Sequence, residues 1–248
     1  MKAFATLLDR LVLTPQRNGK LALLKAYFES TPDPDRGIAL AALASELELK
    51  TARPAIIRSL IEERADPTLF ALSYDYVGDL AETVSLMWPA EPTNHDTPTL
   101  SEIVETLAET PRKEVPELIA RWLDASNPSS RWALLKLLTG GLRVGVSARL
   151  AKTALASLSD DLSTEDIEEV WHGVEPPYTA LFDWVEGRAD KPDISGIPTF
   201  RPLMLAHPLE EPDRAQITAE DFAAEYKWDG IRVQLVQVQG ETRLYSRT

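Results

Sequence analysis

Residues 1–13 read MKAFATLLDRLVL, and their apolar side chains recur at the spacing of one face of a helix. Phe4, Leu7, Leu8 and Leu11 follow the i, i+3, i+4, i+7 rule that aligns side chains along one stripe of an α-helix. The same period resumes after the break at Asn18-Gly19 and continues, between turn signals, to about residue 187. The sequence therefore predicts a mainly α protein.

Capping residues and prolines divide this region into successive helices. Asp66 before Pro67, the capping box from Thr99 to Glu102, and Ser147 are typical of helix starts. Helices are expected at roughly 36–47, 52–64, 67–74, 78–88, 100–109 and 113–125. Four further helices are expected to end near residues 139, 158, 173 and 187. No repeat of fixed period is present, which argues against a solenoid.

The pattern changes near residue 190. Residues 188–200 are rich in breakers and indicate an interdomain linker, which we place at 191–200. Beyond it, residues 222–227 are a short strand candidate, and the alternation from Ile231 to Val236 predicts a strand that returns after Gly240. A single hairpin cannot bury a sheet face alone. We therefore expect an all-α domain over 1–190 and, over 201–248, the beginning of a truncated α+β domain.

Composition excludes several classes of protein. The 248 residues are 44% apolar and include no Cys, so disulfides and thiolate metal sites are ruled out. Asp9 and Arg10 interrupt the apolar N-terminus, which is not typical of a signal peptide, and the longest apolar run, Ile38 to Ala44, is too short for a membrane span. His95 and His172 have no partner at ligand spacing, so no metal site is expected. We expect a cytoplasmic protein.

The charge distribution contains a local inversion. The net charge is 26 − 39 = −13, yet no acidic residue occurs between Asp124 and Asp160. Five basic residues lie in that window: Arg131, Lys136, Arg143, Arg149 and Lys152. Such a window is expected to face an anion; the alternative is a buried helical hairpin whose few surface positions are basic.

The turn at residues 139–147, TGGLRVGVS, lies inside this window. Its glycines lack side chains and let backbone N–H groups approach phosphates, and a helix that starts after Ser147 directs its positive end at them. Contacts of this kind position a duplex without reading its sequence. The alternative is an ordinary helix-ending Gly followed by a tight turn. The candidate DNA-binding residues are Arg131, Lys136, Gly140, Gly141, Arg143, Gly145, Ser147 and Arg149.

A second candidate site lies in the segment 225–232, EYKWDGIR. A Lys at a strand end, followed by Asp229 and Gly230, suits a nucleophilic amine. With an ordinary pKa of about 10.4, only about one Lys in a thousand is neutral near pH 7.4, and a neighbour such as Arg232 or a metal ion lowers the pKa. The alternative is a hairpin turn that contains the common Asp-Gly pair.

These motifs resemble those of known enzymes. The pattern from Lys227 to Arg232 resembles the nucleotidyl-lysine motif of ATP-dependent DNA ligases, RNA ligases and mRNA capping enzymes, and Ser246-Arg247 matches the next motif of that superfamily. Residues 201–208, RPLMLAHP, resemble the segment that leads into the adenylation domain of cellular ATP-dependent DNA ligases. Residues 139–147 and 77–82, VGDLAE, resemble segments of the α-helical DNA-binding domain of those ligases. The resemblance spans nearly the whole chain.

The resemblance implies a role for each matched residue. Lys227 is implied as the nucleophile that becomes AMP-lysine, Glu225 as the ligand of the adenine amino group, Arg232 as a ribose contact, and Arg247 as a contact of the nucleotide phosphate and the DNA 5′-phosphate. Asp229 receives no definite role. ATP and Mg²⁺ are implied as cofactors. The implied partner is nicked duplex DNA, bound by a monomer that serves DNA repair, replication and recombination.

Two other functions remain open on the sequence. One is a different lysine nucleotidyltransferase, an RNA ligase or capping enzyme; the long helical region argues against it. The other is a non-catalytic helical DNA-binding module. The later motifs and metal-holding carboxylates of the family are expected after Thr248. We therefore expect this chain to bind DNA weakly and not to seal it.

Overall fold

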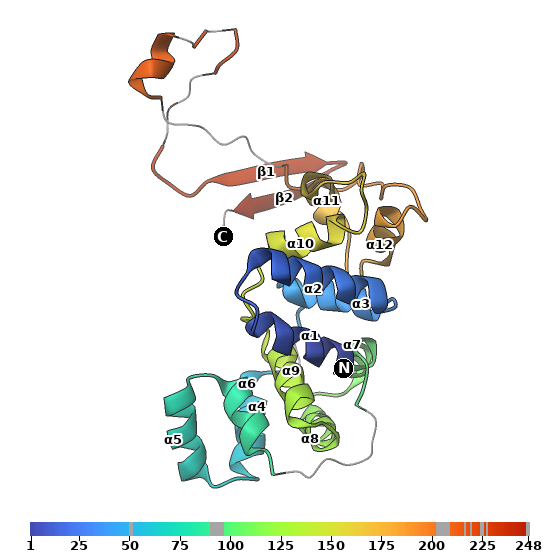
Figure 1. Cartoon of the computed structure of the whole chain (residues 1–248), viewed down its shortest axis with the longest axis vertical. Coiled ribbons are helices and arrows are strands. Elements are labelled where there is room, and N and C mark those ends of the chain that lie inside the picture. Colours follow the sequence, from blue (N-terminus) through green and yellow to red (C-terminus); the bar gives the residue numbers. More distant parts are fainter. Residues whose placement is uncertain are drawn as a thin grey trace. The chain divides into compact units, whose positions relative to one another are not determined.

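The computed structural model describes residues 1–49, 52–89, 97–201, 209–215, 217–218, 220–223, 226 and 228–246. Within these residues the chain forms twelve α-helices, one 3₁₀ helix and two strands (Figure 1). The helices are α1 (Lys2–Val12), α2 (Arg17–Ser30), α3 (Asp35–Leu43), α4 (Pro54–Glu62), α5 (Pro67–Val77), α6 (Leu80–Met87), α7 (Leu100–Glu109), α8 (Val115–Ala125), α9 (Pro128–Thr139), α10 (Ala148–Ala156), α11 (Thr164–Trp171) and α12 (Thr179–Val185). The 3₁₀ helix η1 is Glu211–Ala215, and the strands are β1 (Val233–Val238) and β2 (Glu241–Ser246). The predicted fold class, mainly α with a C-terminal β-hairpin, is confirmed.

The chain divides into two compact units. Unit 1 comprises Met1–Ile167 and Val174–Pro192, and unit 2 comprises Glu168–Gly173 and Asp193–Thr248. Helix α11 begins in unit 1 and ends in unit 2, and the β-hairpin belongs to unit 2. The functional domain boundaries expected from the sequence stay a prediction.

Side-chain caps fix where several helices begin. Asp66 accepts a hydrogen bond from the Leu69 N–H at 2.9 Å, and Thr99 and Glu102 form the expected capping box at the start of α7. Asn127 caps α9, and Ser147 caps α10 by accepting from the Leu150 N–H at 3.2 Å. Each cap satisfies a backbone donor that the first helical turn leaves without a partner. The caps predicted at Asp66, Thr99 and Ser147 are therefore confirmed.

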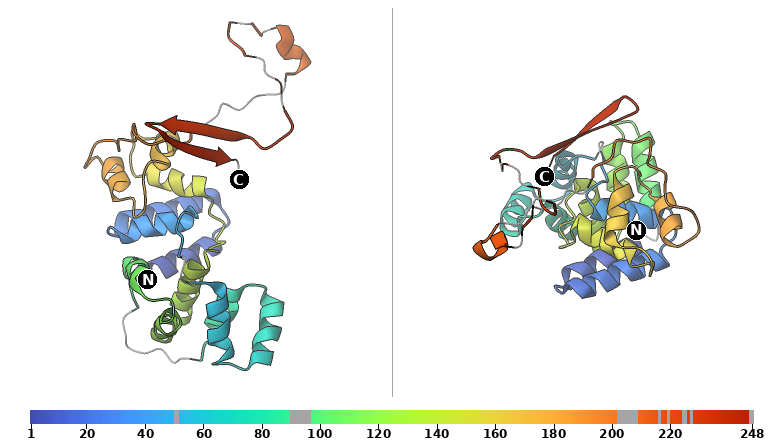
Figure 2. Two further views of the ribbon diagram at one scale, coloured as in Figure 1. Left: turned by 180° about the vertical axis from the view of Figure 1, so that it is seen from behind. Right: turned by 90° about the horizontal axis from the view of Figure 1, so that it is seen from above.

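Helix α9 lies in the core of unit 1. It packs against α1, α6 and α8, and Figures 1 and 2 show it beside the latter two. The side chains at positions 133, 134, 135, 137 and 138 are all buried, although they point to different sides of the helix. A helix whose side chains are buried on several sides is one that its neighbours enclose. The loop after α9 is thus held at one end by a firmly packed element.

In unit 2, the hairpin rests on an aromatic cluster. The ring of Tyr245 in β2 lies 5.3 Å from the ring of His172 and 5.8 Å from that of Phe200, and its hydroxyl donates to the Pro198 carbonyl at 2.6 Å. Strands β1 and β2 are antiparallel, with Leu235 opposite Leu244. Both residues of the connecting turn, Gln239 and Gly240, have positive φ, as a tight hairpin turn with right-handed twist requires.

The structure differs from the sequence-based prediction at some element boundaries. Phe222, Ala223 and Tyr226 are not in a strand, while the other residues of the candidate strand at 222–227 lie outside the described residues. The predicted helix at 36–47 ends at Leu43, because Ser45 has a φ of +63° and turns the backbone out of the helix. In the described part of the chain, no helix combines the length and apolar character that a membrane span requires.

Candidate nucleic-acid interface

The loop between α9 and α10, residues 140–147, begins and ends at defined backbone positions. Gly140 ends α9 with a φ of +69°, a conformation that glycine adopts without the penalty of a Cβ. Ser147 begins α10 as its N-cap. Between them, Gly145 has a φ of +68°, and Arg143 has a φ of +47°, which is uncommon for a residue with a side chain. The path of the loop backbone is therefore set by three residues with positive φ and by the N-cap of α10.

The loop presents backbone donors without partners in the described part of the protein. The N–H groups of residues 141–147 donate to no described residue, whereas the Gly140 N–H is held by the Leu137 carbonyl. The Arg143 side chain is exposed and makes neither an ion pair nor a hydrogen bond with any described residue. A run of N–H groups beside a guanidinium and a helix N-terminus is suited to bind an anion.

Two of the sequence segments singled out above meet at this loop. Gly78 and Asp79, between α5 and α6, share a hollow of about 200 Å³ with Thr139, Gly141 and Arg143. The same hollow is lined by Arg58 and Tyr74, and the Arg58 guanidinium stacks over the Tyr74 ring at 4.3 Å from its centroid. Segments 60 residues apart thus form one basic surface. Arg58 was not expected from the sequence, since nothing in its local pattern distinguishes it.

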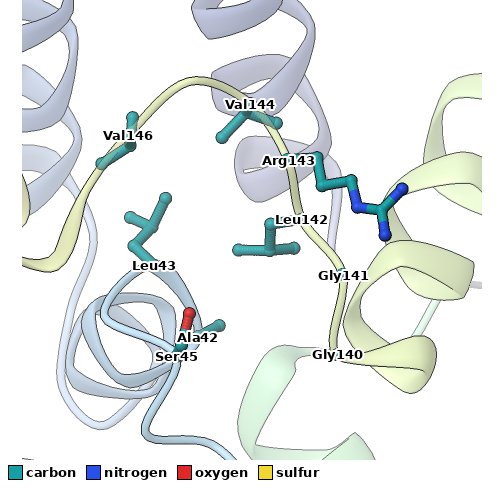
Figure 3. Close-up of a pocket in the computed structure, with 9 residues that line it drawn as sticks. All are labelled: Ala42, Leu43, Ser45, Gly140, Gly141, Leu142, Arg143, Val144 and Val146. Atoms are coloured by element: carbon teal, nitrogen blue, oxygen red, sulfur yellow. The ribbon is translucent and has the colours of Figure 1, made fainter. Parts of the chain in front are cut away.

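A second hollow lies on another side of the loop. It has a volume of about 290 Å³ and is lined by residues 140–144 and 146 together with the end of α3 (Figure 3). Leu43, Leu142 and Val146 border it, whereas the Arg143 guanidinium is directed away from them (Figure 3). The apolar side of the loop therefore faces α3, and the charged side chain remains available to a ligand.

Helix α10 contributes a further charge. Arg149 is exposed and forms an ion pair with Glu165 at 2.7 Å, with both side chains more than 60% exposed. Surface pairs of this kind contribute at most about 1 kcal/mol, because water and salt screen them. The pair with Glu165 therefore fixes the Arg149 side chain only weakly.

Two basic residues of the acid-free window lie in the interior. Arg131 is 3% exposed, and its Nε donates to the Leu123 carbonyl at 2.7 Å. Lys136 is 5% exposed and forms an ion pair with Asp79 at 2.5 Å. These internal partners satisfy charges that would otherwise be costly to bury. We therefore correct the expectation that both face DNA and leave them out of the interface.

Asp79 has two structural functions at the interface. Its carboxylate accepts from the Glu82 N–H at 3.0 Å as the N-cap of α6, and it binds the Lys136 ammonium. Burial alone would raise the pKa of Asp79, but the hydrogen bonds from Lys136 and from backbone N–H groups outweigh it and lower the pKa. Asp79 is thus an ionised link that fastens the start of α6 to α9.

The loop also rests on a residue that the sequence did not single out. The Lys20 side chain of α2 is buried, and its ammonium donates to the Val144 carbonyl at 2.6 Å and to the Gly145 carbonyl at 2.9 Å. Arg17, one turn earlier in α2, is exposed beside Gly145 and Ser147. Neither residue lies near the loop in the sequence, so no local signal indicated them.

The nucleotidyl-lysine motif is described only in part. Glu225, Lys227 and Arg247 lie outside the described residues. Arg232, Asp229 and Gly230 are exposed. The flanking Tyr226, Trp228 and Ile231 are 82–85% exposed, so the described residues of this segment do not enclose a nucleotide. Among the described residues, no three His, Asp or Glu side chains converge on a metal-binding point.

Comparison with known proteins assigns this α-helical region to a family. Residues 1–156 match the family model "DNA ligase N terminus". The chain therefore belongs to this family, which confirms the resemblance to DNA ligases that the motifs indicated.

A named relative supports the same assignment. The chain is 28% identical over 223 residues to "Probable DNA ligase" of Rhodococcus opacus (strain B4). The match covers 82% of this chain and 42% of that relative, so the chain spans less than half of the relative's length.

Proposed function

We propose that this chain grips duplex DNA with the α9–α10 loop and carries, at Lys227, the nucleophile of an ATP-dependent DNA ligase that seals nicks. One observation carries the DNA-binding part. A single hollow is bordered by residues of two segments that both resemble parts of the ligase DNA-binding domain, and Arg58 joins them there. The residues from these segments include Gly78, Asp79, Gly141 and Arg143. The family match of residues 1–156 supports the same proposal.

The chemistry of the loop suits contacts with the DNA backbone. Exposed Arg143 and Arg149 supply charge, and the N–H groups of residues 141–147 supply donors that have no described partner. These groups bind phosphate oxygens and do not distinguish base pairs. A nick-sealing enzyme needs such binding, because nicks occur in any sequence. The long helical region that carries this loop argues against the alternative of an RNA ligase or capping enzyme that shares the lysine motif.

The catalytic part of the proposal rests on the resemblance of the lysine motif. When bound, ATP supplies the adenylyl group and Mg²⁺ offsets the phosphate charge. The Lys227 amine attacks the α-phosphorus, and pyrophosphate leaves as the nitrogen–phosphorus bond forms. Glu225 holds the adenine amino group, Arg232 contacts the ribose, and Arg247 contacts phosphate. The adenylyl group then passes to the 5′-phosphate of the nick, and the 3′-hydroxyl displaces AMP.

The DNA-binding part is tested with Arg143→Glu/Arg149→Glu in the 248-residue chain. We expect binding to nicked duplex DNA to weaken about tenfold or more and its salt dependence to become less steep, because phosphate contacts are lost. The matched control is Arg112→Glu/Arg121→Glu, which makes the same change of charge at two exposed arginines without an ion pair to a described residue. Equal affinity of the double variant and the wild type would refute the proposed surface. Equal binding of single-stranded RNA would favour the other nucleotidyltransferases.

The catalytic part is tested in the full-length protein with ATP labelled at the α-phosphate. We expect a labelled adduct that is stable in alkali and labile in acid, as a lysine phosphoramidate is. Lys227→Ala should abolish it, and Lys113→Ala, a change at an exposed lysine of the helical region, should preserve it. Persistence of the adduct in Lys227→Ala would rule out Lys227 as the nucleophile. Absence of any adduct in the wild type would leave a non-catalytic DNA-binding module.

A further inference from the structure

Lys20 occupies an unusual position beneath the α9–α10 loop. It is only 8% exposed, and its ammonium hydrogen-bonds two consecutive carbonyls, those of Val144 and Gly145, which lie 124 and 125 residues further along the chain. Lys20 makes no ion pair with any described residue. A buried ammonium is costly unless hydrogen bonds satisfy it, and here the two loop carbonyls do so.

The two hydrogen bonds from Lys20 also determine how two peptide groups of the loop are oriented. In a planar trans peptide, the C=O and the N–H of the same unit point in opposite directions. The peptide bonds Val144–Gly145 and Gly145–Val146 are both trans. Because Lys20 draws the two carbonyls inward, the N–H groups of Gly145 and Val146 face the opposite side. Neither of these N–H groups donates to a described residue.

Gly145 is adapted to this contact. A Cβ at position 145 would lie 2.4 Å from the Lys20 Nζ, so the ammonium would have to shift from its place between the two carbonyls. The backbone there has a φ of +68°, which residues with a side chain rarely adopt. The absence of a side chain at position 145 therefore allows the ammonium to approach the backbone. This contact gives a physical reason for a glycine at position 145 of the segment that resembles the ligase turn.

An open hollow lies beside these residues. It has a volume of about 660 Å³ and is lined by Pro15, Arg17 and Lys20 from the start of α2, and by residues 145–147 and Leu150. Arg17 is exposed there and makes no ion pair with a described residue. The hollow is thus bordered by Gly145 and Val146, by the Lys20 side chain and by a guanidinium without an ion pair to a described residue.

We propose that Lys20 is a positioning residue that orients the Gly145 and Val146 N–H groups toward a phosphate of the bound DNA, with Arg17 as its direct cationic contact. This inference rests on the proposed DNA-binding function and extends it to a second helix, α2. Lys20 itself does not touch the phosphate. Its ammonium is compact and offers three donors, which suits two adjacent carbonyls, and its charge adds to the potential that attracts the anion.

The test compares Lys20→Met with Lys25→Met in the 248-residue chain. Lys25 is a matched control because it lies on the same helix and donates to a carbonyl of Ser157, at the far end of α10 from the loop. Both changes remove one positive charge. Lys20→Met removes two hydrogen bonds to backbone carbonyls, and Lys25→Met removes one together with the ion pair to Glu29. We expect Lys20→Met to weaken binding of a nicked duplex about tenfold, because two hydrogen bonds to a charged group lose their orientation. Lys25→Met should change affinity less than about twofold. Binding is measured below the melting temperature of both variants.

A second measurement begins with the wild-type chain, in which no variant has to fold. In the wild-type chain, the amide proton and nitrogen resonances of Gly145 and Val146 should shift on titration with the nicked duplex, and these shifts should be lost in Lys20→Met. Equal affinities of the two variants would overturn the inference. So would DNA binding by the wild type that leaves both amides unshifted; in that case the proposed function would stand. Failure of the wild type to bind DNA at all would reject the proposed function and the inference together.

Discussion

Arg36 is the most densely paired charge among the described residues. Its guanidinium binds Glu186 through two contacts, of 2.5 and 3.0 Å, and Asp33 through two more, of 2.7 and 2.9 Å. It also stacks over the Phe182 ring, 4.2 Å from the centroid. The residue is 6% exposed. Paired, fork-like contacts with two carboxylates are among the strongest hydrogen bonds in proteins, and here they join α3 to the end of α12.

This cluster predicts how the stability of unit 1 depends on pH. The hydrogen bond from Arg36, helped by one from Arg188, lowers the pKa of Glu186 from its usual 4.5. A lowered folded-state pKa stabilises the fold above the unfolded-state pKa, and this contribution is lost as the pH falls through the folded value. Glu186→Gln should therefore lower the free energy of unfolding near neutral pH by about 2 kcal/mol. The difference from wild type should shrink below pH 4.5.

The measurement is urea unfolding across that pH range, with Glu109→Gln as control. Glu109 is exposed at the end of α7 and makes no ion pair with a described residue. A constant difference between Glu186→Gln and wild type at every pH would contradict the assigned role of the carboxylate.

At the scale of single elements, the end of α9 depends on one glycine of a pair. Gly140 has a φ of +69°, whereas Gly141 does not have a positive φ, and a Cβ at either position would meet no atom within 4 Å. The two positions therefore differ in backbone conformation and not in the space available for a side chain. We expect Gly140→Ala to lower the free energy of unfolding by about 1 kcal/mol and Gly141→Ala to leave it nearly unchanged.

The comparison is made by thermal unfolding of the two variants. Equal melting temperatures would mean that the left-handed turn is not what ends α9. DNA affinity provides an independent observation, since Gly141 borders the hollow shared with Asp79. The methyl group of Gly141→Ala should reduce the affinity for DNA, although this variant leaves the free energy of unfolding nearly unchanged.

The elements themselves could be predicted from the sequence because their signals are local. Apolar spacing and the caps at Asp66, Thr99 and Ser147 lie within one turn of the helices that they start. What supports the α9–α10 loop is not local. The contacts of Lys20 with Val144 and of Lys136 with Asp79 join residues 124 and 57 positions apart, and only the tertiary fold brings them together. For this reason Lys136 was expected at the surface and Lys20 was not expected at all.

At the scale of the whole molecule, a net charge of −13 has to be reconciled with binding to a polyanion. The Debye length is about 8 Å at physiological ionic strength, so carboxylates far from a phosphate are largely screened. The charges that decide binding are those close to the contact. The acid-free window from residue 125 to 159 supplies such a surface, with Arg143 and Arg149 exposed beside the loop. Local composition therefore governs the proposed interaction, and the total charge has little effect.

Glu165 allows local and total charge to be separated. It is the carboxylate paired with Arg149 at 2.7 Å, so Glu165→Gln both removes a negative charge near the proposed DNA surface and releases Arg149 from that pairing. Glu117→Gln, at an exposed position of α8, makes the same change of net charge, −13 + 1 = −12. We expect Glu165→Gln to tighten binding of nicked duplex by up to about fivefold, the range that a surface ion pair can supply, and Glu117→Gln to leave it unchanged. If both variants tighten binding equally, total charge governs the interaction. If Glu165→Gln has no effect, the carboxylate beside Arg149 does not influence DNA binding, and the argument from local charge is wrong at this position.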